Sequence, residues 1–316
     1  MNFDHVQSTG PLRMSPGEMK NVFEKRVVRD FDATGPPNRD PTFVMVGGAQ
    51  GSGKSTTIWQ AETELSGTTQ KIIPDNGAAW VRGYDKLARV MPADAFKYAR
   101  EAGAGSFGAA LASRARKMKA HIILERAPPL DVAEDSAFYR RQGYRTELHV
   151  IATPRSQSLT GVFGRVEKAL RDDGHIGTNV VVSRSTHDEA YAGWARVVFD
   201  TEQQKQFDRI VIKQRDGTVL HDNELIRRRD GRIAWKNAPV ALEALLSSRH
   251  RAIGGSEAAE MNKTWKRIVK SRHMKSDPYL RSLPLKDYRD EMRYAVERPG
   301  SRVIVENDLV LPETVQ

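Results

Sequence analysis

The stretch GGAQGSGKST, residues 47–56, decides the fold of this chain. It completes the pattern G-x-x-x-x-G-K-[ST], with Gly48, Gly53, Lys54 and Ser55 in the fixed positions. The β-rich run PTFVMV comes directly before it, and a run that favours a helix, TTIWQAETEL, overlaps its end. A glycine-rich loop between a strand and a helix is typical of a phosphate-binding loop, whereas the pattern alone is weaker.

Each part of this loop has a role in holding a nucleoside triphosphate. The glycines let the backbone turn tightly and direct successive N–H groups at one anion. The following helix adds the dipole of its N-terminus. Lys54 can reach the β- and γ-phosphates, and the Ser55 hydroxyl can ligate Mg²⁺. The alternative, a flexible Gly/Ser loop, is disfavoured by the flanking strand and helix. The predicted nucleotide-binding residues are Gly48, Ala49, Gln50, Gly51, Ser52, Gly53, Lys54, Ser55 and Thr56.

Length and composition restrict the class of protein. At 316 residues, the chain is long enough for one large domain, or for one domain with an appendage. Its 39% apolar and 28% charged residues are typical of a globular protein. No apolar run approaches the ~18 residues of a membrane-spanning helix, so no membrane partner is expected. The N-terminal residues lack the apolar core of a secretory signal, and we expect a loose leader there.

Net charge and cysteine content restrict the kinds of binding partner and of site that this chain can have. The net charge of +10 favours anionic partners, namely nucleotides, nucleic acid or an acidic protein. The basic residues are spread along the chain, which indicates a solvated basic surface more than a nucleic-acid interface. The absence of cysteine excludes disulfides, thiolate metal sites and a cysteine nucleophile. It fits a cytoplasmic location, and it would also suit a protein that unfolds during export.

Apolar and β-rich runs alternate with helical patterns through the first two thirds of the chain. This alternation predicts an α/β protein in which helices flank both faces of a parallel sheet, and the phosphate-binding loop makes it a P-loop NTPase fold. Ligands collect at the carboxyl ends of the strands in such sheets. After the last parallel strand, which is expected to end at residue 213, Arg-Asp-Gly turns at 215–217 and 229–231 predict short antiparallel strands. The parallel strands are expected at 41–46, 71–74, 121–125, 144–151 and 207–213.

The two ends of the chain differ from this middle part. Residues 1–40 are expected to form a leader and a helix that begins at Ser15 and ends near Asp30. Residues 41–238 are expected to form the α/β core. From 239 to 316 the pattern becomes mainly helical, and we expect a C-terminal appendage there.

Two carboxylates fall at the ends of expected strands. Asp75 is placed to take a proton from an acceptor hydroxyl, although it could instead cap the next helix. Glu125 ends an otherwise apolar strand, where a carboxylate is costly unless it meets a metal, a cation or a substrate hydroxyl. The alternative for Glu125 is a structural ion pair with Arg126 or another arginine. Arg165 and Arg184, taken singly, are expected to be surface residues.

Taken in order, these features resemble the zeta toxin family of P-loop kinases over roughly residues 18–220. The loop is followed by an aspartate about twenty residues beyond its lysine, by the strand IILE ending at Glu125, and by a Gly-Tyr entry to the next strand. An ATPRS turn leads into the helix that carries Arg165, and Arg184 precedes the run HDEAY. The run FDRIV before an Arg-Asp-Gly turn completes the order. The ordered set is specific, although no single motif after the loop is.

The resemblance implies a toxin that transfers the γ-phosphate of ATP or GTP, with Mg²⁺, to the 3′-hydroxyl of UDP-N-acetylglucosamine. It implies that Asp75 is the base, that Glu125 and Asp75 contact the acceptor, and that Ser55 holds the metal. It also implies an inhibitory antitoxin or chaperone as partner, because an unrestrained kinase of this type would harm its maker. The catalytic residues implied are Lys54, Asp75, Arg165 and Arg184.

The chain departs from the family pattern on the acceptor side. Family members follow the strand-end glutamate with Gly-Thr, whereas Arg126-Ala-Pro-Pro129 follows Glu125 here. This change leaves NAD as an alternative acceptor, as in zeta-like effector proteins delivered into host cells. A further alternative, a nucleotide-gated nucleic-acid-binding protein, is not favoured because basic and aromatic residues are not interleaved. His187 is expected to cap and orient its helix rather than take part in chemistry.

Overall fold

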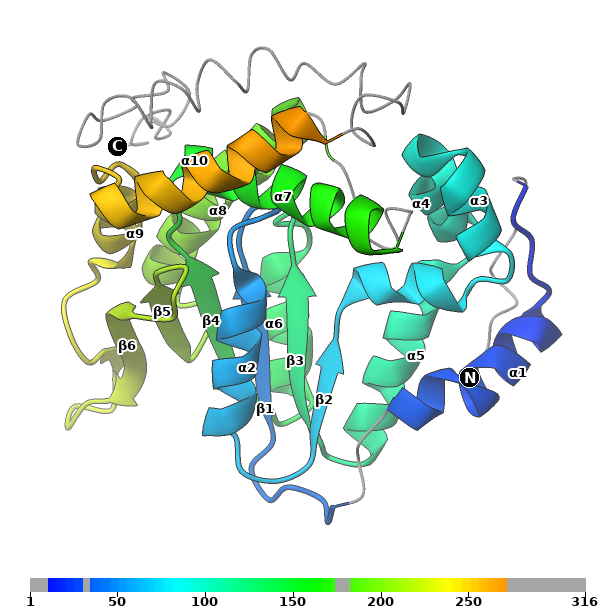
Figure 1. Ribbon diagram of the computed structural model, residues 1–316. Coiled ribbons are helices and arrows are strands. Elements are labelled where there is room, and N and C mark those ends of the chain that lie inside the picture. Colours follow the sequence, from blue (N-terminus) through cyan, green and yellow to red (C-terminus); the bar gives the residue numbers. More distant parts are fainter. Residues whose placement is uncertain (1–10, 31–34, 174–181, 183, 272–316) are drawn as a thin grey trace.

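A central sheet organises the protein, and the computed structural model describes residues 11–30, 35–173, 182 and 184–271 (Figure 1). The strand order is β2-β3-β1-β4-β5-β6-β7. The first five strands in the chain are parallel, as predicted. β6 then extends the sheet antiparallel to β5, and β7 pairs antiparallel to β6. The strands are β1 Thr42–Gly47, β2 Thr69–Ile72, β3 His121–Arg126, β4 Arg145–Ile151, β5 Arg209–Lys213, β6 Val219–Arg227 and β7 Ile233–Trp235.

The central strand β1 fixes where a ligand can bind. It lies between β3 and β4, and all six of its residues are buried. The chain leaves β1 toward β2 on one side and later adds β4 and β5 on the other. The carboxyl end of β1 is therefore the point where the strand order changes direction, and open α/β sheets bind ligands at such a point.

Helices cover both faces of this sheet. Val44 and Val46 pack under α2, against Ile58, whereas Phe43 and Met45 belong to the larger core on the opposite face. Figure 1 shows α2 in front of the sheet and α6 behind it. The helices are α1 Pro16–Lys25, α2 Lys54–Glu64, α3 Tyr84–Val90, α4 Pro92–Glu101, α5 Ala104–Lys117, α6 Val132–Arg141, α7 Arg155–Asp173, α8 Arg184–Gln204, α9 Ala241–Arg249 and α10 Gly255–Lys270.

Helices α7 and α10 lie across the carboxyl ends of the strands, at the top of Figure 1. The two helices touch at Gly164, where a Cβ atom would lie 2.9 Å from the methyl group of Thr264. None of the helices in the described ranges has the length and apolar character needed to cross a membrane.

The expected C-terminal helices are present as α9 and α10. In α9, the side chains of Ala241 and Leu245 are fully buried in the main core. The Glu202 carboxylate caps α9 by accepting hydrogen bonds from the backbone N–H groups of Ala241 (2.7 Å) and Leu242 (3.2 Å). Residues 1–10 of the leader and 272–316 of the appendage lie outside the described residues.

Two element boundaries differ from the expectation. The helix expected to run to Asp30 ends at Lys25, and a 3₁₀ turn, Val27–Asp30, follows it. The second strand ends before Pro74, because a proline has no N–H group for the sheet ladder. Asp75 therefore lies in a short 3₁₀ helix, η2 (Pro74–Trp80), rather than at the strand end itself.

Candidate active site

The loop between β1 and α2 has the geometry of a phosphate-binding loop. Gly51 (φ +78°) and Gly53 (φ +99°) lie in the left-handed region, which residues with a side chain rarely adopt. Helix α2 begins at Lys54, so its first N–H groups face the loop. Lys54 is buried, and its Nζ donates to the carbonyls of Gly48 (2.9 Å) and Ala49 (3.1 Å). The backbone therefore has the tight turn that the sequence predicts.

Glu125 lies beside this loop lysine. Its Oε1 is 3.5 Å from Lys54 Nζ. Arg126 points elsewhere and pairs with Asp135 of α6 at 2.6 Å. The ion pair with Arg126 weighed as an alternative is thus not formed, and the strand-end carboxylate faces the phosphate-binding lysine instead. Burial lowers the pKa of Lys54 below its usual 10.5, and the charge of Glu125 opposes that shift.

Asp75 completes a group of charges around the loop. The N-cap of η2 is Ile73, so Asp75 does not cap that helix. Burial and the negative charge of Glu125 raise the pKa of the Asp75 carboxyl above its usual 3.8, while Lys54 lowers it. A carboxylate with a raised pKa is a stronger base, as proton abstraction from a hydroxyl requires.

The two predicted arginines are placed differently by the structure. Arg165, on α7, is exposed, and its charge acts on both Lys54 and Asp75. The structure thus brings Arg165 into the electrostatic field of the loop. Arg184 is the first residue of α8, and its side chain lies outside the described part of the structure.

Ser55 is the residue that fits a metal ion. It is exposed in the first turn of α2, next to Lys54. Among the described residues, no group of three or more His, Asp or Glu side chains could hold a metal by itself. Mg²⁺ keeps several waters and binds phosphate oxygens, and in P-loop proteins the hydroxyl after the loop lysine is one of its protein ligands, so Ser55 suits it.

His187 belongs to a buried polar cluster between α7 and α8. Its ring is fully buried, with Nε2 2.8 Å from Ser158 Oγ and Nδ1 3.1 Å from Asp188 Oδ1. Arg155 holds the same carboxylate through two hydrogen bonds of 2.8 and 2.7 Å. Hydrogen bonds from His187 and Arg155 hold the pKa of Asp188 at about 2, against the effect of burial. The cluster holds the two helices together, in accord with an orienting role for His187.

Three residues that the sequence did not single out also act on the site. Arg100 of α4 carries a positive charge close enough to lower the pKa of Asp75. The Arg215 guanidinium donates to the carbonyl of Gly51 in the loop. Trp194 of α8 donates its indole N–H to the carbonyl of Ala127 at 2.7 Å. Arg215 had a signal in the sequence, because it lies two residues beyond the last parallel strand.

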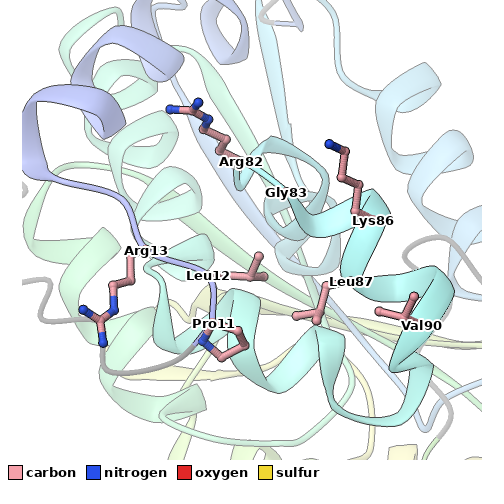
Figure 2. A pocket seen from close by; sticks show the side chains of 8 residues that line it. All are labelled: Pro11, Leu12, Arg13, Arg82, Gly83, Lys86, Leu87 and Val90. Atoms are coloured by element: carbon pink, nitrogen blue, oxygen red, sulfur yellow. The ribbon is translucent and has the colours of Figure 1, made fainter.

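A separate hollow of about 570 Å³ lies between α3 and the segment before α1. Leu12 and Leu87 lie together in it, while the side chains of Arg82 and Lys86 point away from them (Figure 2). Neither the phosphate-binding loop nor the carboxylates Asp75 and Glu125 line it. It is therefore distinct from the candidate active site.

Comparison with solved structures supports this fold. A chain of the PezAT chromosomal toxin-antitoxin system of Streptococcus pneumoniae superposes with a TM-score of 0.65 at 18% identity, covering 82% of this chain and 99% of that chain. A chain from the complex of AvrRxo1-ORF1 with AvrRxo1-ORF2 matches at 14% identity with a TM-score of 0.46. The match covers 95% of this chain and 95% of that chain. The same complex with ATP gives 12% identity, the same coverage and 0.47. Only the first likeness is close enough to bear on the fold.

Sequence comparison identifies the family. No curated protein sequence matches this chain. The zeta toxin family model, in contrast, matches residues 27–226, which is more than half of the chain. The match spans the phosphate-binding loop, both carboxylates and the two predicted arginines. The protein therefore belongs to the zeta toxin family of phosphotransferases.

Proposed function

We propose that this protein is a toxin kinase that transfers the γ-phosphate of ATP or GTP to the 3′-hydroxyl of UDP-N-acetylglucosamine. The observation that carries the proposal is the meeting of Lys54 and Glu125, 3.5 Å apart, with Asp75 inside the same electrostatic field. A phosphate-binding cation paired with Glu125, together with a second carboxylate, Asp75, whose pKa is raised, suits transfer to a hydroxyl. A site for nucleotide binding alone would have no use for the base.

The residues divide the work of an in-line transfer. Asp75 accepts the proton of the acceptor hydroxyl as its oxygen bonds to the γ-phosphorus. The bond from the γ-phosphorus to the β–γ bridging oxygen breaks, and the nucleoside diphosphate leaves with that electron pair. Lys54, Arg165 and Arg184 neutralise the charge that spreads over the transferring group. Glu125 accepts a hydrogen bond from a hydroxyl of the acceptor and so orients it.

A magnesium ion fits this scheme through Ser55. The exposed hydroxyl at the start of α2 would hold it together with oxygens of the nucleotide. The ion would screen the negative charge between the β- and γ-phosphates. This chain supplies the remaining positive charge from its own lysine and arginines.

An inhibitory protein partner is part of the proposal. The similar chain from Streptococcus pneumoniae belongs to a toxin-antitoxin system, and family membership makes the same need plausible for this chain. A kinase that depletes a common sugar nucleotide must be restrained in the cell that makes it. An antitoxin or chaperone that covers the nucleotide site would do so.

NAD is the second candidate acceptor, and the segment after Glu125 favours it. Arg126 is tied to Asp135, and the carbonyl of Ala127 accepts a hydrogen bond from Trp194. Pro129 packs so closely on α8 that a Cβ atom at Gly193 would lie 2.6 Å from its ring. These contacts hold the segment after Glu125 in place, whereas other family members usually have a small, flexible Gly-Thr pair there. A different segment on the acceptor side of the site is consistent with a different acceptor.

Asp75→Asn tests the proposed chemistry. The amide keeps the shape of the carboxyl group but cannot take the proton, so transfer should fall by about 10²–10⁴-fold. ATP affinity should stay within about twofold, since Lys54 and the loop are unchanged. The matched control is Asp94→Asn, which alters an exposed carboxylate of α4 and should leave transfer unchanged. Full activity of Asp75→Asn would show that another group takes the proton.

A further inference from the structure

The turn between β5 and β6 reaches the phosphate-binding loop. The turn is closed by hydrogen bonds from Gln214 N–H to Thr218 O (2.8 Å) and from Gly217 N–H to Gln214 O (3.0 Å). Asp216 stabilises it further by accepting from the Thr218 N–H at 2.9 Å. Gln60 of α2 donates to the carbonyl of Gly217. The turn is thus a fixed element, anchored to the helix that follows the loop.

From this turn, the side chain of Arg215 enters a narrow space beside the loop. Its Nη1 donates to the carbonyl of Gly51. A Cβ atom at Gly53 would lie 2.8 Å from Arg215 Cγ, and one at Gly161 of α7 would lie 3.2 Å from both terminal nitrogens. The guanidinium therefore lies between the loop and α7, in a space that exists because both elements have glycine at the contact.

The hydrogen bond to Gly51 sets the direction of one peptide group in the loop. In a trans peptide, the C=O and the next N–H point in opposite directions, so fixing the carbonyl also fixes the N–H. Here that N–H belongs to Ser52 and donates to the carbonyl of Ala49 at 3.2 Å, which closes the turn of the loop. Thr153 does the same for the next peptide, since its hydroxyl donates to the carbonyl of Ser52 at 2.7 Å. Two successive carbonyls are thus held from outside the loop, and the Gly53 N–H is directed away from Thr153.

The positive charge of Arg215 is destabilised by its surroundings, and a bound anion would offset that destabilisation. Arg215 is partly buried, and burial together with the charge of Arg165 lowers the pKa of its guanidinium. Arg165 also interacts with the Asp75 carboxylate, which partly balances its positive charge, while it repels Arg215. Two cations in the field of a phosphate-binding loop stabilise a bound polyphosphate, because its negative charge offsets their mutual repulsion.

We propose that Arg215 is a positioning residue for the nucleotide: it holds the Gly51 peptide so that the loop is set for a nucleoside triphosphate. The proposal rests on the proposed use of this loop to bind ATP or GTP. It assigns a function to the first Arg-Asp-Gly turn that the second one, at 229–231, does not share. Arg229 is exposed and lies in a turn at the far edge of the sheet.

The two turns supply the test and its control. The affinity for MgATP is measured by titration calorimetry for wild type, Arg215→Gln, Arg215→Lys and Arg229→Gln. Loss of a hydrogen bond from a charged donor should weaken binding about 10- to 100-fold in Arg215→Gln. Arg215→Lys keeps the charge and should lie between wild type and Arg215→Gln, while Arg229→Gln should equal wild type. If Arg215→Gln does not fold, Arg215→Lys carries the comparison.

Rescue by a small cation separates positioning from a structural role. In Arg215→Ala, methylguanidinium at concentrations that do not denature the protein should restore part of the affinity, and it should not change wild type. Affinity for MgATP within twofold of wild type in Arg215→Gln would overturn the inference. So would a loss of affinity that methylguanidinium does not restore. Absence of MgATP binding by wild type would overturn the proposed function as well.

Discussion

At the scale of single residues, Asp75 shows how the site prepares a base. Its carboxyl is placed in a partly buried position by the 3₁₀ helix that Pro74 begins, next to a second carboxylate. Both features make its negative form less stable, and both make it a better proton acceptor. The positive charges of Lys54 and Arg100 lower the pKa of Asp75 and so limit the rise caused by burial and by Glu125.

This arrangement predicts the pH dependence of transfer. Only the deprotonated carboxyl acts as a base, so kcat/KM should fall as the pH falls through the raised pKa of Asp75. The midpoint of that acid limb should lie above 3.8, the usual value. Arg100→Gln removes a positive charge that lowers this pKa, and it should move the midpoint to higher pH.

The control for the pH profile is Asp94→Asn, whose midpoint should equal that of wild type. Initial rates at saturating ATP and limiting acceptor give the profile directly. A rate that stays constant on acidification down to pH 3.8 would contradict the assignment of Asp75 as the base. A midpoint unchanged in Arg100→Gln would contradict the electrostatic account of its shift.

At the scale of elements, Trp194 joins three parts of the site. It is fully buried on α8, and its indole N–H bonds to Ala127 just after β3. Its six-membered ring fills the space where a side chain at Gly47 would lie, at the start of the phosphate-binding loop. The helix that carries Arg184, the strand that carries Glu125 and the loop itself are thus held by one side chain.

Trp194→Phe should therefore destabilise the protein. The change leaves the carbonyl of Ala127 without its donor and leaves part of the ring space empty. The free energy of unfolding should fall by about 1–3 kcal/mol, the cost of a buried polar group without a partner. Urea unfolding measures it, with Trp59→Phe as control, because Trp59 is 64% exposed. Equal midpoints for the two variants would show that the buried hydrogen bond contributes nothing.

The sequence predicted the local parts of this site better than the distant ones. Lys54 was assigned because its neighbours form a contiguous motif, and Glu125 because a charge at the end of an apolar strand needs a partner. The sequence does not predict the 3₁₀ helix around Asp75, because Pro74 ends a short apolar run that is typical of a strand. Arg215 and Trp194 were missed for a different reason: their partners lie far away in the chain, and only the folded topology brings them together.

At the scale of the whole molecule, the C-terminal helices support the site. In α9, Ser248 donates to the carbonyl of Ala152, and Arg249 donates to the carbonyl of Tyr191 while lying 4.0 Å from its ring centre. Tyr191 in turn donates to the carbonyl of Thr153, the residue that holds Ser52 of the loop. A continuous set of hydrogen bonds thus joins α9 to the phosphate-binding loop.

Leu245→Ala tests how far the fold depends on this helix. Leu245 is fully buried in the main core, so its truncation should lower the free energy of unfolding by about 2–5 kcal/mol. Val240→Ala, just before the helix at 41% exposure, should change it little. Chemical denaturation of both variants gives the comparison. A loss below that range for Leu245→Ala would mean that α9 is an independent appendage and not part of the core.

The measurement that tests the central claim most directly is phosphate transfer from γ-labelled ATP to a small panel of acceptors. The panel contains UDP-N-acetylglucosamine, other UDP-sugars, NAD and water alone. The account predicts label on UDP-N-acetylglucosamine, at its 3′-hydroxyl. Label on NAD alone would contradict UDP-N-acetylglucosamine as the acceptor and would show that the same transfer reaction uses NAD. Release of labelled phosphate to water in every sample, with no labelled acceptor, would contradict the claim that this protein is a small-molecule kinase.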